Sequence, residues 1–201
     1  MNKKIIKEAL ALVFITFVAV LLLAVAYEVT KEPIQAAKEQ EKIDSYRAVL
    51  AGAETFEPVD EAICSSWASP VEGTAILEAN VAKNADGAEV GCVLSASSNK
   101  GYGGEIVLSI GILPDGTISG VKVTSMSETV GLGAECQNEE WVSQFAGIQA
   151  SEVRWTKSGK TAPDEIDAIS SATKTTRAVT GAVNGALAFA REQFGYGGKG
   201  E

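Results

Sequence analysis

The stretch that organises this chain is Asp167-Ala-Ile-Ser-Ser-Ala-Thr173, which runs directly into Lys174-Thr-Thr-Arg-Ala-Val-Thr-Gly-Ala-Val-Asn-Gly-Ala-Leu187. Its pattern predicts a loop that becomes a helix. Ser170 and Ser171 are residue types that favour helix N-termini, and apolar residues then recur every three or four positions. The predicted helix begins near Thr173. Unpaired backbone N–H groups and the helix dipole can hold a phosphate there, beside Lys174 or Arg177.

Two interpretations of this stretch compete. On physical grounds alone it is an ordinary capped helix that packs its Ala/Val face on a sheet, since a short motif by itself is a weak signal. The pattern Asp-x-x-Ser-x-Ala-Thr, however, resembles the flavinylation motif of the FMN-binding domains in the G subunit of Rnf complexes and in the C subunit of sodium-pumping NADH:quinone reductases. In that family a dedicated flavin transferase, which uses FAD, attaches FMN to the last Thr of the motif through a phosphoester bond.

The resemblance gives the positions of the motif their roles. It implies that Thr173 is the FMN acceptor, and that Asp167 is recognised by the transferase or braces the loop. Ser171 stands where the family usually has Gly, and unlike Gly it disfavours a positive φ. The motif residues implied to bind the cofactor beside Thr173 are Ser170, Ser171, Ala172 and Lys174.

Two glycine-rich loops extend the resemblance. Lys100-Gly-Tyr-Gly-Gly104 and Glu128-Thr-Val-Gly-Leu-Gly133 look like the family's Gly-Tyr-Gly-Gly and Glu-Thr-Pro-Gly-Leu-Gly segments, with Val130 in place of the usual Pro. Without the family they would be hairpin loops whose glycines relieve strain. With it, glycines such as Gly103 and Gly131 are expected to let the backbone approach the flavin ring. The implied cofactor contacts are Gly101, Tyr102, Gly103, Gly104, Glu128, Thr129, Gly131, Leu132 and Gly133.

From Thr74 onward, short β-prone segments alternate with turn signals. The turn signals are Asp86-Gly87, the loop at 99–104 and Pro114-Asp-Gly116, and Asp-Gly between such segments favours a hairpin. The sequence therefore predicts an antiparallel meander. Its strands are expected at Thr74–Ala82, Glu89–Ser97, Glu105–Ile112 and Thr117–Thr124.

Helices complete the predicted fold, an α+β domain at 74–194 in which an antiparallel sheet packs against helices. A helix near Asn138–Phe145 and a short strand at Val153–Lys157 precede the helix that begins near Thr173. The glycine-rich residues 195–201 are expected to form a flexible tail.

The N-terminus carries one long apolar run. As a helix, Ala9–Tyr27 extends about 28 Å, close to the thickness of a bilayer. Lysines crowd residues 1–8, so the positive-inside rule places that end in the cytoplasm and the rest of the chain outside. A cleaved signal peptide competes, with Ala24-Val25-Ala26 as its cleavage site, but the apolar run exceeds the ~7–15 residues of a signal core. A retained single-pass anchor in the cell membrane is preferred.

Residues 28–73 are expected to link the anchor to the domain. A juxtamembrane helix at Ile34–Leu50 begins after Pro33, because proline is tolerated in a first helical turn. The residues that follow are expected to form a connector with one short element near Asp60–Trp67.

Composition excludes several classes of site. The chain has no histidine, which removes the usual base of a nucleophile triad, the commonest zinc ligand and the usual haem ligand. Cys64, Cys92 and Cys136 form no Cys-x-x-Cys pair, so they are buried thiols or one disulfide with a residue left over. No metal site is expected. The formal charge of −9 argues against nucleic-acid binding.

Charged residues before the motif suggest no chemistry of their own. Ser158-Gly-Lys-Thr161 resembles the end of a P-loop, but the first glycine of that motif would fall at Arg154. We expect Lys157 and Lys160 to form a solvated turn. Asp164 and Glu165 are expected to lie on a solvated face.

The three motifs together predict a membrane-anchored flavoprotein subunit of an ion-translocating Rnf-type complex, a ferredoxin:NAD+ oxidoreductase. In this hypothesis the chain relays electrons through covalently bound FMN, has no catalytic residue of its own and works with other membrane subunits. One alternative is a stand-alone extracytosolic flavoprotein for respiratory or extracellular electron transfer. The alternative from another class is an anchored binding or scaffold domain without a cofactor.

Overall fold

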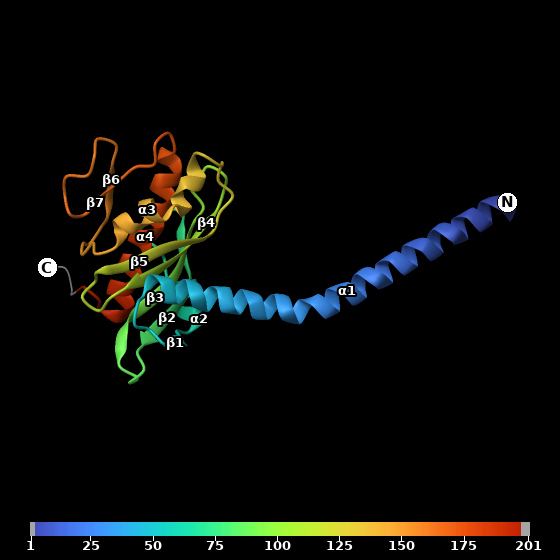
Figure 1. Cartoon of the computed structure of the whole chain (residues 1–201), viewed down its shortest axis with the longest axis horizontal. Helices are drawn as coiled ribbons and strands as arrows, with labels where there is room; N and C mark the ends of the chain where they lie inside the picture. The colour runs from blue at the N-terminus through green and yellow to red at the C-terminus, as the bar shows by residue number, and fades with distance from the viewer. Residues whose placement is uncertain (1–2, 198–201) are drawn as a thin grey trace. The chain divides into compact units, whose positions relative to one another are not determined.

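The computed structural model describes residues 3–197, and its centre is one antiparallel sheet of five strands in the order β1-β2-β3-β4-β5 (Figure 1). Each strand therefore pairs with its neighbour in sequence, which confirms the predicted meander. The strands are β1 (Thr55–Pro58), β2 (Thr74–Lys83), β3 (Glu89–Ser98), β4 (Ile106–Ile112) and β5 (Ile118–Ser125). Strand β1 was not predicted; it pairs along the end of β2, so a part of the expected connector is an edge strand.

The helix α4 (Thr173–Phe194) covers one face of this sheet. Its buried apolar side chains are those of the predicted stripe, including Val179, Val183 and Leu187, and they face inward side chains of β3 and β4 such as Leu94 and Ile110. The helix ends at Gly195, whose φ of 74° is the left-handed conformation that glycine adopts without strain. The largest part of the core lies between α4 and the sheet.

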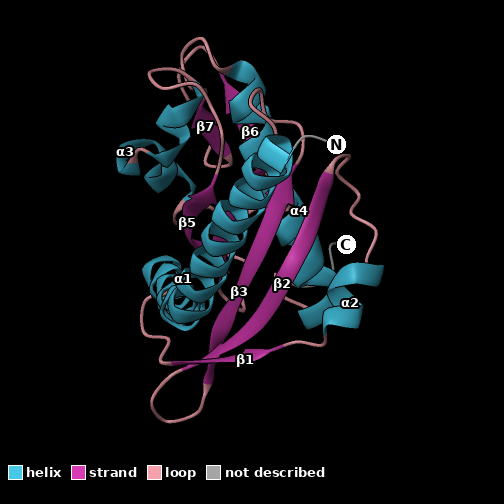
Figure 2. Ribbon diagram, turned by 90° about the vertical axis from the view of Figure 1, so that its right-hand side faces the viewer, coloured by secondary structure: helices cyan, strands magenta, loops and turns pink. Residues whose placement is uncertain are grey.

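The end of helix α1 (Lys3–Val49) lies on the opposite face of the sheet (Figure 2). Two glycines allow this close contact, since a Cβ at Gly111 would lie 2.3 Å from the carbonyl oxygen of Val49 and one at Gly120 would lie 3.0 Å from it. Ser45 and Ser109 share a buried hydrogen bond of 3.1 Å between their hydroxyls. The last turns of α1 are therefore part of the folded domain.

Helix α1 is continuous through Pro33, so the expected second helix starting after this proline is wrong. A proline inside a helix removes one hydrogen bond and costs about 3 kcal/mol. The surrounding residues 31–42 are mostly Ala, Glu, Gln and Lys, strong helix formers that carry the helix past this point. The helix is long and apolar enough to cross a membrane. The chain divides into two units between Ile43 and Asp44, inside this helix.

Short elements fill the remaining connections. The predicted element near Asp60 is helix α2 (Glu61–Ser66), and the side chain of Asp60 caps it. The predicted helix near Asn138 consists of α3 (Glu139–Val142) and the 3₁₀ helix η2 (Ser143–Phe145). Elements that were not predicted are the 3₁₀ helix η1 (Gly133–Gln137) and strand β7 (Glu165–Asp167), which pairs in parallel with the predicted strand β6 (Arg154–Thr156).

The end of the chain is partly ordered, in contrast to the predicted flexible tail. Tyr196 is buried, its N–H donates to the carbonyl of Ala190, and its hydroxyl donates to Glu89. Gly197 donates to the carbonyl of Pro114. These contacts hold residues 195–197 on the domain; residues 198–201 of the expected tail lie outside the described residues. The three cysteines are free, buried thiols, which settles the alternative left open by their number.

Candidate functional site

The predicted acceptor, Thr173, is the first residue of α4. The N-cap is Ala172, so neither Ser170 nor Ser171 caps the helix, and no side chain bonds its first turn in their place. Ser171 has a φ of 60°, and among residues 3–197 it is the only non-glycine residue with a positive φ. Its left-handed conformation turns the chain into the helix, which explains why a glycine would suit this position.

Three threonines at this helix start have different environments. Thr175 is 1% exposed and donates its hydroxyl to Glu128 Oε2 at 2.8 Å. Thr176 is fully buried, accepts from the Ile169 N–H at 3.0 Å and donates to the Ala172 carbonyl at 3.1 Å. Thr173 is half-buried, and within residues 3–197 its hydroxyl makes no hydrogen bond. Among these three threonines, only the predicted acceptor therefore offers a hydroxyl that forms no hydrogen bond within residues 3–197.

The start of α4 also has free backbone donors. The N–H groups of Thr173, Lys174 and Thr175 form no hydrogen bond within the described part of the chain, whereas that of Thr176 donates to the Ala172 carbonyl at 3.0 Å. Lys174 and Arg177 are exposed in this part of the helix. Unpaired N–H groups, the positive end of the helix dipole and two cations fit an anionic phosphate group.

The two glycine loops meet at Glu128, whose side chain points into the protein and is 8% exposed. Its Oε1 accepts from the N–H of Gly103 at 3.1 Å, and its Oε2 accepts from Thr175. A Cβ at Gly101 would lie 2.7 Å from this carboxylate, and one at Gly133 would lie 2.2 Å from it. Three segments far apart in sequence therefore contact the same carboxylate.

The geometry gives Gly103 a structural role of its own. A Cβ at Gly103 would lie 1.9 Å from the carbonyl oxygen of Ser127, so a side chain is excluded by the neighbouring loop itself. Gly131 differs, because it has a φ of 77° and open space around its missing Cβ. Of these two glycines, only Gly131 leaves room for another molecule.

Large side chains at the tips of the two loops are exposed. Tyr102 is 72% exposed, Val130 89% and Leu132 43%. The ring centroid of Tyr102 lies 5.8 Å from the ammonium nitrogen of Lys174, next to the predicted acceptor. Thr129 shapes the second loop, since its carbonyl accepts from the N–H groups of Leu132 and Ala134 at 3.1 and 3.0 Å. Such exposed rings and aliphatic groups can contact a flat aromatic ligand.

Two open hollows flank the motif. One, of about 680 Å³, is bordered by Lys100, Arg154, Lys174 and Arg177, together with Trp155. The other, of about 570 Å³, is bordered by Gly131, Trp141 and Ser170, with Glu135 and Glu140 on its rim. Each is large enough for a ligand of the size of a nucleotide.

Asp167 braces the loop before the motif. Its carboxylate accepts from the N–H of Lys160 at 2.7 Å, its own N–H donates to Gln144 Oε1 at 2.8 Å, and its carbonyl accepts from the indole of Trp141 at 2.7 Å. Gln144 was missed by the sequence analysis, because only the fold brings η2 next to β7.

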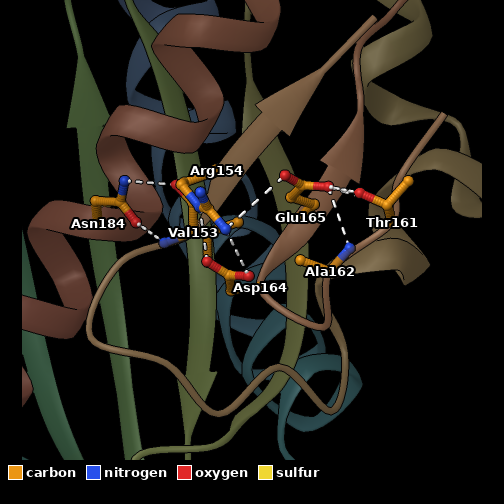
Figure 3. Close-up of polar contacts among 7 residues, drawn as sticks. All are labelled: Val153, Arg154, Thr161, Ala162, Asp164, Glu165 and Asn184. Atoms are coloured by element: carbon orange, nitrogen blue, oxygen red, sulfur yellow. Dashed lines mark hydrogen bonds and ion pairs between the residues drawn. The ribbon is translucent and has the colours of Figure 1, made fainter. Parts of the chain in front are cut away.

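Asp164 and Glu165 were predicted to lie on a solvated face, but their carboxylates bind other residues of the same segment (Figure 3). Arg154 donates to both oxygens of Asp164, at 2.7 and 3.1 Å, and this pairing lowers the pKa of the Asp164 carboxyl. Glu165 accepts from the N–H groups of Thr161 and Ala162, which lower its pKa. Lys157 and Lys160 are exposed, as expected for a solvated turn.

Asn184 fixes this segment to α4. Its side-chain amide accepts from the N–H of Val153 at 2.8 Å and donates to the carbonyl of the same residue at 3.0 Å, as Figure 3 shows. The segment from β6 to β7 is therefore held against the same helix that begins with Thr173.

Comparison with known proteins identifies the family of this chain. Residues 101–188 match the FMN-binding domain family, and residues 1–49 match the family described as the RnfG N-terminal region. The chain is 33% identical to the G subunit of the Na(+)-translocating ferredoxin:NAD(+) oxidoreductase complex of Acetobacterium woodii, over 90% of this chain and 89% of that protein. It is 31% identical to the G subunit of the ion-translocating oxidoreductase complex of Methanosarcina acetivorans, over 96% of this chain and 98% of that protein.

Among solved structures, the chain is similar to the C subunit of the Na(+)-translocating NADH-quinone reductase from Parabacteroides distasonis. The TM-score is 0.50 and the sequence identity 24%, over 75% of this chain and 82% of that chain. This likeness supports the fold.

Proposed function

Because this chain belongs to the family formed by the G subunits of ion-translocating oxidoreductase complexes, we propose that it is a membrane-anchored electron-transfer protein that carries FMN on Thr173 through a phosphoester bond. The observation that carries the proposal is the contrast among the three threonines of α4. The hydroxyls of Thr175 and Thr176 are buried and bonded, and that of Thr173 is not. FMN supplies the electron-carrying chemistry, while the protein supplies attachment, orientation and surroundings.

Attachment needs a second protein. A threonine hydroxyl is a weak nucleophile, and the chain has no histidine to activate it. A flavin transferase must therefore present FAD as an activated pyrophosphate. The Thr173 oxygen forms a bond to the phosphorus on the flavin side, the pyrophosphate bond breaks, AMP leaves, and the hydroxyl proton passes to a base of the transferase. The residues of this chain that hold the resulting charge are the free N–H groups of the first turn, with Lys174 and Arg177.

Mass spectrometry tests the attachment. Co-expressed with a flavin transferase, the full chain should gain the mass of one FMN less water, and a proteolytic peptide should place it on Thr173. Thr173→Ala should fold and gain nothing. Thr176→Ser, which keeps the buried hydroxyl, is the matched control and should be flavinylated like the wild type. Flavin retained on Thr173→Ala, or mapped to Thr175 or Thr176, would contradict the proposal.

The anchor in this proposal is the apolar part of α1, with the N-terminus in the cytoplasm and the FMN-binding domain outside. The lysines before the apolar run support this orientation. Protease added to intact spheroplasts should digest the domain of a membrane-bound chain. A C-terminal tag that is protected until the membrane is broken would reverse the orientation, and a soluble mature chain beginning near Tyr27 would indicate a cleaved signal peptide.

The partners in this proposal are the other membrane subunits of an Rnf-type complex. The family resemblance over nearly the whole chain favours this function over a stand-alone flavoprotein. Gentle solubilisation followed by purification through a tag on this chain should recover membrane subunits that contain further redox centres. Recovery of the flavinylated chain by itself, from membranes that retain those subunits, would favour the stand-alone alternative.

A further inference from the structure

A buried carboxylate without a cationic partner among residues 3–197 lies next to the first turn of α4, which begins with the proposed acceptor. Glu128 follows β5 and is 8% exposed, yet within residues 3–197 it forms no salt bridge. Glutamate is rarely buried unless it is paired or hydrogen-bonded. Its position therefore calls for a physical reason other than core packing.

The hydrogen bonds of Glu128 join three segments. One oxygen accepts from the backbone of Gly103, 25 residues earlier, and the other accepts from the hydroxyl of Thr175, 47 residues later. Gly103 belongs to the first glycine loop, and Thr175 lies two residues after the proposed acceptor. A single side chain thus links both glycine loops to the first turn of α4.

The surroundings are shaped for this carboxylate. Gly101 and Gly133 lie where any Cβ would collide with it, at 2.7 and 2.2 Å from its oxygens. A Cβ at Gly133 would also lie 2.6 Å from the hydroxyl oxygen of Thr175. Gly133 therefore makes room for Glu128, whereas a Cβ at Gly101 would lie closer still, at 2.3 Å, to the carbonyl oxygen of Gly104.

We propose that Glu128 is a positioning residue for the flavin: its carboxylate sets the distance between the glycine loops and Thr173, and its negative charge opposes reduction of a flavin attached there. The inference rests on the proposed function of Thr173. The Gly103 N–H can only donate, and a carboxylate accepts from both partners through charge-assisted hydrogen bonds, which a neutral amide cannot form. Beneath a flavin, in surroundings of low dielectric, such a charge disfavours the addition of an electron.

The competing interpretation is that Glu128 serves only to stabilise the fold. Both interpretations predict a loss of stability when it is replaced, so stability cannot separate them. Only a positioning residue should also change the rate of flavin attachment and the reduction potential of the attached flavin. The attachment rates and reduction potentials of the variants must therefore be measured on protein that is folded.

The test uses the full chain with a flavin transferase and three substitutions. Glu128→Gln keeps the shape and removes the charge. Thr175→Val keeps the shape of the partner and removes its donor. Thr180→Val is the matched control, because Thr180 is an equally buried threonine of α4 whose hydroxyl donates only to the carbonyl of Thr176, at 2.9 Å.

We expect Glu128→Gln to slow flavin attachment about tenfold, because hydrogen bonds of a neutral amide replace those of a charged carboxylate. It should also shift the midpoint potential of the attached flavin to a more positive value. Thr175→Val should slow attachment without a comparable shift in potential, and Thr180→Val should change neither. Combined, Glu128→Gln and Thr175→Val should slow attachment by less than the product of their separate effects, because both act on the hydrogen bond between these two side chains.

Hydrogen exchange of the flavin-free chain supplies a measurement that needs no cofactor. The Gly103 amide should be protected in the wild type and in Thr180→Val, and should exchange faster when Glu128 is replaced by alanine. The inference is overturned if Glu128→Gln attaches flavin at the wild-type rate and the attached flavin keeps the wild-type midpoint potential. It is also overturned if the Gly103 amide of the wild-type chain exchanges without protection. A wild-type chain that never acquires flavin would instead refute the proposed function, and the exchange measurement would still decide whether Glu128 braces the loops.

Discussion

At the scale of single residues, one backbone conformation determines where the proposed acceptor lies. Ser171 adopts a φ of 60°, which costs an L-residue roughly 1–2 kcal/mol. Its side chain is exposed, so burial of the serine gives no compensating stability. The bonds of Thr176 to Ile169 and Ala172 hold the loop in this conformation from the inside. The chain therefore keeps a strained residue two positions before its proposed functional group.

Replacing Ser171 with glycine should relieve this strain. Glycine makes the unfolded chain more flexible, which lowers the free energy of unfolding by about 0.5–1 kcal/mol. In the folded chain it removes the strain at this position, which raises the free energy of unfolding. Ser171→Gly should therefore equal or exceed the wild type in free energy of unfolding, measured with urea by tryptophan fluorescence. Ser170→Gly is the control: its φ is not positive, so it should lower that free energy by about 0.5–1 kcal/mol. Equal losses in both variants would show that no strain is stored at Ser171.

At the scale of elements, the segment from β6 to β7 owes its shape to side chains. Two strands of three residues pair in parallel, and parallel pairing gives little stability over so short a length. Arg154 closes the segment by binding Asp164, Glu165 caps the turn at Thr161, and Asn184 fixes the start to α4. Because this segment leads directly into residues 167–173, its side-chain contacts help to define the position of the proposed flavin-attachment motif.

This segment should resist acid until its carboxyl groups take up protons. The bond from Arg154 lowers the pKa of Asp164 below its ordinary value of 3.8 in the folded chain. The stabilising contribution is therefore fully present above that ordinary pKa and is lost as the pH falls through the lowered folded pKa. An NMR titration of the side-chain carboxyl carbons should place the wild-type midpoint of Asp164 below 3.8, and Arg154→Gln should move it upward.

Glu165 is the internal control for that titration. Its pKa is lowered mainly by the backbone N–H groups of Thr161 and Ala162, and only weakly by Arg154. Arg154→Gln should therefore shift Asp164 more than Glu165. Equal shifts would mean that the substitution disturbs the whole turn rather than one ion pair.

The difference between predicted and missed elements has a physical cause. Strands β2 to β5 and helix α4 were predicted because their apolar periodicity and turn residues are local signals. Strand β1 escaped prediction because Thr55–Pro58 is short, contains a proline and forms an edge. The proposed acceptor Thr173 was chosen from its motif, which is also a local signal. The contacts of Glu128 could not, because Gly103 and Thr175 are distant in sequence and only the fold brings them together.

At the scale of the whole molecule, the division into two units falls inside a helix, between Ile43 and Asp44. Tyr46, Val49 and Leu50 lie after that division and are nearly fully buried against the sheet. The hydroxyl of Tyr46 also donates to Glu78 at 3.0 Å. The end of α1 therefore serves as a structural element of the FMN-binding domain, and the domain begins well before the first strand.

Two truncated chains should separate the proposed anchoring role of α1 from its structural role in the domain. A chain starting at Lys38 keeps every buried residue of α1 and should be soluble and fold like the domain of the full chain. A chain starting at Ala51 exposes the sheet face under Val49 and Leu50, which should cost roughly 5 kcal/mol, from about 1.5–3 kcal/mol for each large buried side chain. Since domains are stable by only about 5–15 kcal/mol, the shorter chain should unfold at much lower urea concentration.

The substitution Gly111→Ala distinguishes loss of the contact between α1 and the sheet from a general effect of shortening the chain. A Cβ at Gly111 would lie 2.3 Å from the Val49 carbonyl oxygen, so Gly111→Ala should sharply destabilise the chain that starts at Lys38. In the chain that starts at Ala51 the obstructing helix is gone, and the same substitution should change the free energy of unfolding little. Equal destabilisation in both chains would mean that Gly111 matters for the sheet itself, and that α1 is not seated on it as the structure has it.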